Sequence, residues 1–168
     1  FFGWGQLIDA HTIEIRGGVT GATTTWKKAA LDYILTSSLT FQGSTSAVLT
    51  IEPGVTVKFL SGIGLEVAEN GPGSLQVNGT AESPVTFTSA LTSPTRGSWN
   101  GVRLYKNCLS GAYLHGLSVL WAGAVIGASI RIDGAGPELF GVTVAGSSST
   151  GIWITDGRPV LENVTVDA

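Results

Sequence analysis

Charge is scarce in this sequence, and so are sulfur-containing residues. Asp, Glu, Lys and Arg make up 12% of the 168 residues, about half the share usual in globular domains, and methionine is absent. Disordered chains and coiled coils both need many polar or charged residues, so this composition excludes them. The single cysteine, Cys108, excludes an internal disulfide and a metal site built from several cysteines. The net charge of −3 gives no electrostatic support to a nucleic-acid partner.

The sequence also has no apolar run typical of a membrane helix, which needs about 20 mostly apolar residues. Residues 107–130 contain no charged side chain, but they include polar residues and four glycines. We therefore expect a series of short buried strands there and no membrane span. The chain starts at Phe1 without a methionine, and no basic segment followed by an apolar one opens it. This start is expected of a processed or partial product whose signal peptide, if one existed, has been removed.

Helical periodicity is nearly missing, and residues 26–33 are the only candidate for a helix. Instead, short triplets recur in which two apolar residues flank a middle residue, with Gly, Pro, Asn and Ser between the triplets. Examples are Leu39-Thr40-Phe41, Val102-Arg103-Leu104 and Ile130-Arg131-Ile132. Side chains alternate along a strand, so the flanking apolar residues face one way and the middle residue faces the other.

A repeat near the carboxyl end points to the architecture. Residues 130–144 read IRIDGAGPELFGVTV and residues 152–166 read IWITDGRPVLENVTV, so an offset of 22 without a gap gives seven identities. One step earlier the match is looser, with offsets of 25 and 28. A repeat of this size is typical of stacked units, because two or three short strands cannot bury their own apolar face.

We therefore predict an all-β fold, a right-handed parallel β-helix of roughly seven coils with about 22–28 residues each. In this β-solenoid Ile130 stacks on Ile152 and Val142 stacks on Val164. An antiparallel sandwich or a propeller is the structural alternative, but propeller blades repeat at about 40–45 residues. We assign residues 1–20 to an N-terminal lead-in or cap segment and residues 21–168 to the β-helix domain, which could belong to a longer solenoid.

Four motifs follow one another in a distinctive order. LTIEPGVTVKF at residues 49–59 precedes GSLQVNGTA at 73–81, PVTFTS at 84–89 and GSWNGV at 97–102. This order resembles the right-handed parallel β-helix repeat proteins with a pectin-lyase-like fold, which are secreted or surface-associated. The resemblance covers about residues 20–168, and it implies the fold and an extracellular or cell-surface location. It implies no single activity, because adhesins, filament and surface-layer proteins and carbohydrate-active enzymes all use such modules.

One row of outward residues is a candidate ligand site. Arg103 and Arg131 occupy equivalent positions, Trp153 continues the row one coil later, and Asp133 lies two residues after Arg131. We predict that these four residues form a strip that contacts carbohydrate, because Arg binds carboxylates or hydroxyl groups and Trp stacks on rings.

Signatures of catalysis are weak. The resemblance implies that a pectate lyase would use an Arg base beside calcium held by several aspartates, and no aspartate cluster supplies that site. The polygalacturonase pattern of several aspartates, Gly-His-Gly and Arg-x-Lys is absent. One coil would nearly superimpose Asp133 and Asp156 as an acid pair for glycoside hydrolysis, but turn aspartates usually bond to backbone amides. We assign no catalytic residue, no metal site and no cofactor.

Two further patterns concern outward polar residues. Asn78 and Asn163 each begin an Asn-x-Thr motif, the acceptor pattern for glycosylation. Threonine is the middle residue of six triplets, and Ser118 joins them; a row of these hydroxyls could order water as ice-binding solenoids do, but Thr is also a favourable exposed strand residue. The six are Thr40, Thr50, Thr56, Thr86, Thr143 and Thr165.

The last repeat is as apolar as the interior ones, so it leaves an open end that needs a cover. We expect further coils of a longer protein or head-to-tail stacking of a second copy, which produces fibres when the contact does not close. The candidate assembly residues are Phe1, Phe2 and Trp4 at the start and Val164 and Val166 at the end.

The sequence thus predicts a non-catalytic extracellular structural or adhesive β-helix module, including a self-assembling filament or surface-layer subunit. Its expected partners are itself, further β-helix coils or surface glycans. The alternative is a carbohydrate-binding or polysaccharide-cleaving β-helix module that uses Arg103, Arg131 and Trp153.

Overall fold

The computed structural model describes residues 12–167, and the regular elements in this part of the chain are all β-strands. The segment with the only helical signal, residues 26–33, contains no helix: β3 ends at Trp26, β4 begins at Asp32, and a bend lies between them. A segment of eight residues is too short to be stable as an isolated helix, so pairing of its two ends with neighbouring strands decides its structure.

The strands are short, with three to six residues each, because Gly, Pro, Asn and Ser interrupt the apolar triplets. Their bounds are β1 (Thr12–Ile15), β2 (Gly18–Thr20), β3 (Thr24–Trp26), β4 (Asp32–Leu35), β5 (Leu39–Phe41), β6 (Val48–Ile51), β7 (Thr56–Phe59), β8 (Gly64–Val67), β9 (Ser74–Asn78), β10 (Val85–Ser89), β11 (Gly101–Tyr105), β12 (Tyr113–His115), β13 (Leu117–Leu120), β14 (Ala128–Asp133), β15 (Glu138–Phe140), β16 (Thr143–Ala145), β17 (Thr150–Thr155), β18 (Val160–Glu162) and β19 (Thr165–Asp167).

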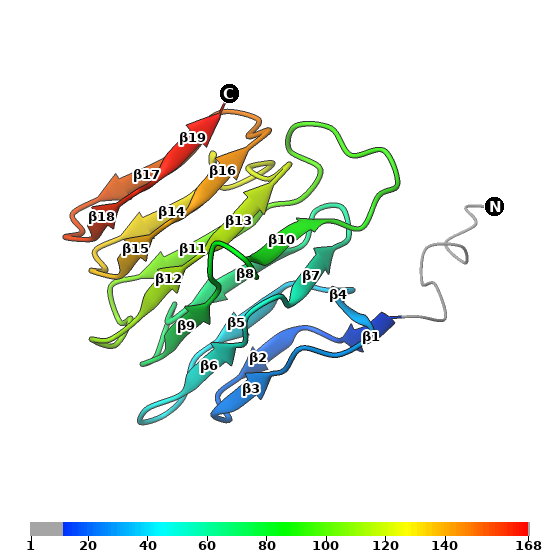
Figure 1. Cartoon of the computed structure of the whole chain (residues 1–168). Coiled ribbons are helices and arrows are strands. Elements are labelled where there is room, and N and C mark those ends of the chain that lie inside the picture. The colour runs from blue at the N-terminus through cyan, green and yellow to red at the C-terminus, as the bar shows by residue number, and fades with distance from the viewer. Residues whose placement is uncertain (1–11, 168) are drawn as a thin grey trace.

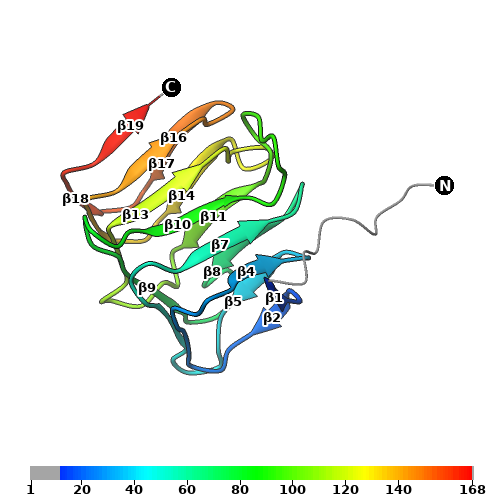
Figure 2. The same cartoon turned by 45° about the vertical axis from the view of Figure 1, so that its right-hand side comes forward.

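Each strand pairs in parallel with the third strand before it and the third strand after it, which gives three sheets. Sheet A has the order β1-β4-β7-β10-β13-β16-β19, sheet B runs from β2 to β17, and sheet C runs from β3 to β18. The chain therefore passes through sheets B, C and A in turn, and each turn lies on the one before, from the blue first coil to the red last coil (Figures 1 and 2). This arrangement is consistent with the predicted right-handed parallel β-helix; sheet A has seven layers and sheets B and C have six among the described residues.

The register confirms the predicted stacking of equivalent residues. Ile130 pairs with Ile152, and Thr143 pairs with Thr165. The backbone N–H of Thr165 donates to the carbonyl oxygen of Val142 at 2.8 Å, so the coil that contains Val164 lies directly on the coil that contains Val142.

The coil length varies more than the predicted 22–28 residues. In sheet B, Leu39 pairs with Leu65, 26 residues on, and Val102 pairs with Ile130, 28 residues on. Between them, Leu65 pairs with Val102, which is 37 residues on. The extra length lies in residues 90–100, the green loop after β10 in Figure 1, and it does not disturb the layers because it leaves and re-enters the coil at strand ends.

The interior is filled by columns of apolar side chains. Inward residues of adjacent coils stand directly over one another, and complete burial of a Val, Leu or Ile side chain stabilises a fold by about 1.5–3 kcal/mol. The columns in sheet B contain Leu65, Val102 and Ile130 beside Val67, Leu104 and Ile132, all fully buried.

Trp99 is the largest of these fully buried side chains. It comes from the long loop after β10, and its ring stacks on Phe59 with centroids 4.0 Å apart. Its indole N–H donates to the carbonyl oxygen of Leu120 at 2.7 Å. The loop is thus anchored to two different coils by one aromatic side chain.

The corner between sheets C and A is a sharp bend made by one residue in each of three successive coils. Gly116, Gly141 and Asn163 occupy this corner with φ values of 51°, 63° and 53°. Gly adopts this left-handed region freely, and Asn is among the few other residues that tolerate it. The corner therefore explains why two glycines and one asparagine occupy these positions of the repeat.

The predicted boundary after residue 20 falls at the end of β2. Strands β1 and β2 already pair with β4 and β5, so residues 12–20 lie in the first layers of sheets A and B. Residues 1–11 lie outside the described residues, and the extent of the lead-in or cap segment stays a prediction.

Candidate functional site

The outward face of sheet B carries two rows of polar and aromatic side chains. The register of β8, β11, β14 and β17 places Glu66, Arg103, Arg131 and Trp153 in one row, in four successive coils. A second row, two residues further along each strand, contains Tyr105, Asp133 and Thr155. We call Glu66, Arg103, Tyr105, Arg131, Asp133 and Trp153 the sheet B strip.

Asp133 holds both arginines of the strip. The Nε of Arg103 donates a hydrogen bond to Asp133 Oδ2 at 2.6 Å. The Nη2 of Arg103 forms an ion pair with the same oxygen, also at 2.6 Å. Arg131 donates from Nε to Oδ1 at 3.1 Å and to Oδ2 at 3.0 Å. The Asp133 side chain is 18% exposed, so a carboxylate that is largely shielded from water joins two coils.

The two guanidinium groups set the charge state of this carboxyl. Burial alone would raise the pKa of Asp133, but the hydrogen bonds from Arg131 and Arg103 and their positive charges outweigh burial and lower the pKa below its usual value. Asp133 is therefore an ionised anchor at neutral pH and cannot serve as a general acid.

Tyr105 supports the strip from the side of the earlier coils. The Arg103 guanidinium lies over the Tyr105 ring, 4.3 Å from its centre, and the Tyr105 hydroxyl donates to Glu66 Oε2 at 3.1 Å. Burial and the negative charge of Glu66 raise the pKa of the Tyr105 hydroxyl to about 12. Tyr105 thus stays protonated, and it links a third coil to the cluster.

Trp153 forms the open end of the strip. The Arg131 guanidinium lies 4.8 Å from the centre of the Trp153 ring, and its Nη1 donates to the backbone carbonyl of Ile126 at 3.3 Å. Trp153 itself is 44% exposed. An exposed aromatic face beside a fixed guanidinium suits a ligand that offers both a ring and an oxygen acceptor.

All four residues that the sequence predicted for this site, Arg103, Arg131, Asp133 and Trp153, are brought together. Sequence reasoning missed Tyr105 and Glu66. Tyr105 could have been found from its position two residues after Arg103, but Glu66 lies 37 residues before Arg103 and no repeat in the sequence indicates that step. Their ligand role stays a prediction.

The acid pair considered for glycoside hydrolysis does not align. Asp133 pairs in register with Thr155, and Asp156 lies one position further, at a bend with a φ of 54°. Within residues 12–167, no group of three or more His, Cys, Asp or Glu residues is placed to hold a metal ion. Cys108 packs against the core, and burial raises the pKa of its thiol to about 11.

The two residues predicted as glycosylation acceptors lie in different settings. Asn78 ends β9, and its Oδ1 accepts a hydrogen bond from the Tyr113 hydroxyl at 2.9 Å. Asn163 occupies the corner between sheets C and A. Glycosylation of either residue stays a prediction.

Comparison with known families agrees with the β-helix fold. Residues 17–110 match the model of the pectate-lyase like beta helix domain. The chain belongs to this family. The matched part of this β-helix domain includes Glu66, Arg103 and Tyr105, whereas Arg131, Asp133 and Trp153 lie beyond it. No curated protein and no solved structure matches the chain. A helix suited to crossing a membrane is not found among residues 12–167.

Proposed function

We propose that this β-helix domain is a non-catalytic structural module of an extracellular or cell-surface protein, and that it assembles head to tail. In this proposal the last coil of one copy is covered by the first layers of a second copy. The observation that carries the proposal is the exposed apolar surface of the last coil.

The last coil has core-type residues without a layer above them. Val166 is 51% exposed, Leu161 is 44% exposed and Ile154 is 41% exposed. Their counterparts one coil earlier include Val144 and Ile132, which are fully buried. A hollow of about 650 Å³ opens on this end, and strands β17, β18 and β19 are the edge strands of their sheets. Exposed edges and apolar side chains together favour pairing with another strand layer.

The first layers offer a complementary surface. A hollow of about 220 Å³ at that end is lined by Trp26, Leu39, Phe41 and other residues of the first two coils. The charges of the two ends have opposite excess. Residues 150–167 carry three acidic side chains and one basic one, whereas residues 12–35 carry three basic and two acidic ones. Opposite charge favours the head-to-tail orientation over the two like-to-like orientations.

Residues 1–11 contain the assembly residues that the sequence predicted at the start of the chain. They directly precede β1, which is the edge strand of sheet A at the first end. Phe1, Phe2 and Trp4, predicted from the sequence as assembly residues, lie outside the described residues. Their part in assembly stays a prediction. Val166 belongs to the exposed surface of that coil, and Val164 is partly buried against the core.

Sedimentation velocity of the full chain at increasing concentration tests this proposal. We expect the mean mass to rise with concentration. Ile154→Lys places a charge on the inward row of the last coil and keeps the protein monomeric. Thr155→Lys is the matched control, because Thr155 is the next residue of β17 and faces outward.

Two results would contradict the proposal. One is a monomer at every concentration of the unmodified chain. The other is the same increase in mean mass for the Ile154→Lys and Thr155→Lys variants. Such a result would mean that the inward residues of the last coil do not take part in the contact, so the second copy does not continue the coil.

A second candidate function is glycan binding by the sheet B strip, and the exposure of Trp153 beside Arg131 favours it. The strip would offer the Trp153 ring to a sugar face and the Arg131 guanidinium to a carboxylate or a pair of hydroxyl groups. On a glycan array, Arg131→Ala and Trp153→Ala should each abolish binding, whereas Thr40→Ala on the same sheet should not. Release of unsaturated or reducing ends from polyuronides would overturn the non-catalytic assignment.

A further inference from the structure

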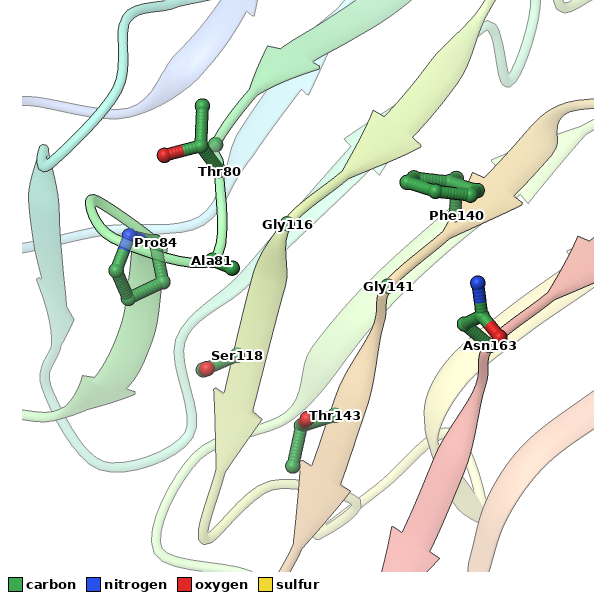
Figure 3. Close-up of a pocket in the computed structure, with 10 residues that line it drawn as sticks. Thr80, Ala81, Pro84, Gly116, Ser118, Phe140, Gly141, Thr143 and Asn163 are labelled. Atoms are coloured by element: carbon green, nitrogen blue, oxygen red, sulfur yellow. The ribbon is translucent and has the colours of Figure 1, made fainter.

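A groove follows the corner between sheets C and A, on a different side of the coil from the sheet B strip. Its floor is the corner itself, where Gly116 and Gly141 replace side chains with bare backbone. Figure 3 shows Thr80, Ala81 and Pro84, from the connection between β9 and β10, on one side of this floor, and Phe140 and Asn163 on the other. The space between them has a volume of about 370 Å³, within the range of small-ligand sites.

Three polar side chains of the groove are neutral and leave their polar atoms open to a ligand. Ser118 and Thr143 contribute hydroxyl groups, and Asn163 contributes a side-chain amide. Within residues 12–167, no hydrogen bond engages these three side chains. None of the residues that line the groove carries a charge. A charged ligand would therefore lose its hydration without gaining a counter-charge.

The hydroxyls belong to a longer row. The register of sheet A stacks Thr56, Thr86, Ser118, Thr143 and Thr165 in five successive coils. Adjacent hydroxyls of the row are separated by the spacing between strands, about 4.8 Å. The groove lies against the centre of this row, so a ligand longer than one ring would meet further hydroxyls on both sides.

Phe140 supplies the apolar wall. It ends β15, and its side chain is 42% exposed at the rim of the groove. Pro84 and Ala81 form the apolar part of the opposite wall. A ligand that fits must combine an apolar face for Phe140 with hydroxyl groups for Ser118, Thr143 and Asn163.

We propose that this corner groove binds an uncharged saccharide. A neutral pyranose ring has C–H groups on its faces for Phe140 and hydroxyl groups on its edge, and each hydroxyl can donate to or accept from Ser118, Thr143 and Asn163. Asn163 also borders the hollow at the end of the last coil, whereas Ser118, Phe140 and Thr143 lie in earlier coils, so their contacts with a saccharide do not require the proposed stacking.

The structure offers a variant that closes the groove without disturbing the coil. A Cβ atom added at Gly141 meets no heavy atom closer than 4.0 Å, so a side chain there projects into open space. Gly141 has a φ of 63°, and Asn163 occupies the same corner one coil later with a φ of 53°. Gly141→Asn therefore keeps a backbone conformation that this corner already accepts, and it fills the groove.

The test is a titration of the full chain with saccharides, monitored through the NMR chemical shifts of its backbone amides. The probes are tetramers of β-1,4-linked glucose, mannose and galactose at millimolar concentration, with tetragalacturonate as the charged comparison. We expect at least one neutral tetramer to shift the amides of Gly116, Ser118 and Thr143. Gly141→Asn and Phe140→Ala should each weaken that binding at least about tenfold. Thr56→Val, in the same hydroxyl row but outside the groove, should leave the affinity unchanged.

Several outcomes would overturn the assignment. These are the absence of shifts at the corner with all three neutral tetramers, shifts confined to Arg131 and Trp153, and equal affinities of Gly141→Asn and the unmodified chain. A corner response to tetragalacturonate alone would also overturn it, because the groove has no positive charge. Circular dichroism of each variant confirms that a loss of binding is not a loss of fold.

Discussion

Among single residues, Asp133 stands out because its carboxylate pairs with two arginines from two coils. Replacing it by Asn leaves Arg103 and Arg131 partly buried and without their shared carboxylate. We expect Asp133→Asn to lower the free energy of unfolding by about 1–3 kcal/mol, as measured by urea unfolding. Asp156→Asn is the matched control. Asp156 is exposed at a bend that Asn tolerates, so its replacement should change stability by less than about 0.5 kcal/mol. Equal effects of the two substitutions would contradict the anchor role.

The lowered pKa of Asp133 leads us to expect that the free energy of unfolding depends on pH. The pKa of Asp133 is lowered in the folded state, so between the two pKa values the unfolded chain binds more protons than the folded one. The stability from Asp133 is therefore present above the unfolded pKa of about 3.9 and is lost as the pH falls through the folded pKa. Urea unfolding between neutral pH and about pH 2 should show a smaller loss of stability in Asp133→Asn than in the unmodified chain. Parallel curves for the two proteins would rule this out.

Inside the core, Trp99 links the long loop to two coils. Its burial, its stacking on Phe59 and its hydrogen bond to Leu120 are all lost in Trp99→Ala, which should cost about 3–5 kcal/mol in the free energy of unfolding. Trp153→Ala, at an exposed position, should cost less than about 1 kcal/mol. The urea concentrations at the unfolding midpoints of the two variants are compared with the midpoint of the unmodified chain. A similar shift in both variants would show that the long loop does not depend on Trp99.

At the scale of strands and turns, the corner between sheets C and A limits which substitutions the coils accept. A Cβ atom at Gly116 would lie within 2.6 Å of the Thr80 backbone nitrogen, and the φ of 51° disfavours an alanine side chain. Gly116→Ala should therefore lower the free energy of unfolding by more than about 2 kcal/mol. Gly141→Asn, at the open position of the same corner, should change it by less than about 1 kcal/mol. Thermal unfolding of both variants tests this contrast, and a reversed order would mean that the corner is built differently.

The strands also show where sequence reasoning stopped. Six threonines were recognised as outward residues of triplets, but the sequence did not say which sheet each triplet joins. Thr40 lies in sheet B and Thr50 in sheet C, whereas Thr56, Thr86, Thr143 and Thr165 share sheet A with Ser118. The row therefore exists only once strands three apart along the chain are known to pair. The corner groove was missed for the same reason, because its residues come from several coils.

At the scale of the whole molecule, the repeat was a reliable guide because stacked coils require similar residues at equal positions. Interior columns demand apolar side chains, and the corner demands Gly or Asn, so the last coils kept a readable offset of 22. The same pattern placed Arg103, Arg131 and Trp153 in one row. The loop at residues 90–100 separates Leu65 from Val102 by 37 residues, which hid the link from Glu66 to that row.

Hydrogen exchange of the backbone amides in the full chain, measured at low and high protein concentration, tests the proposed stacking most directly. The account predicts that amides of β17, β18 and β19 become more protected at high concentration, together with those of β1, and that Ile154→Lys removes this gain. Protection of these edge strands that does not change with concentration would contradict head-to-tail assembly.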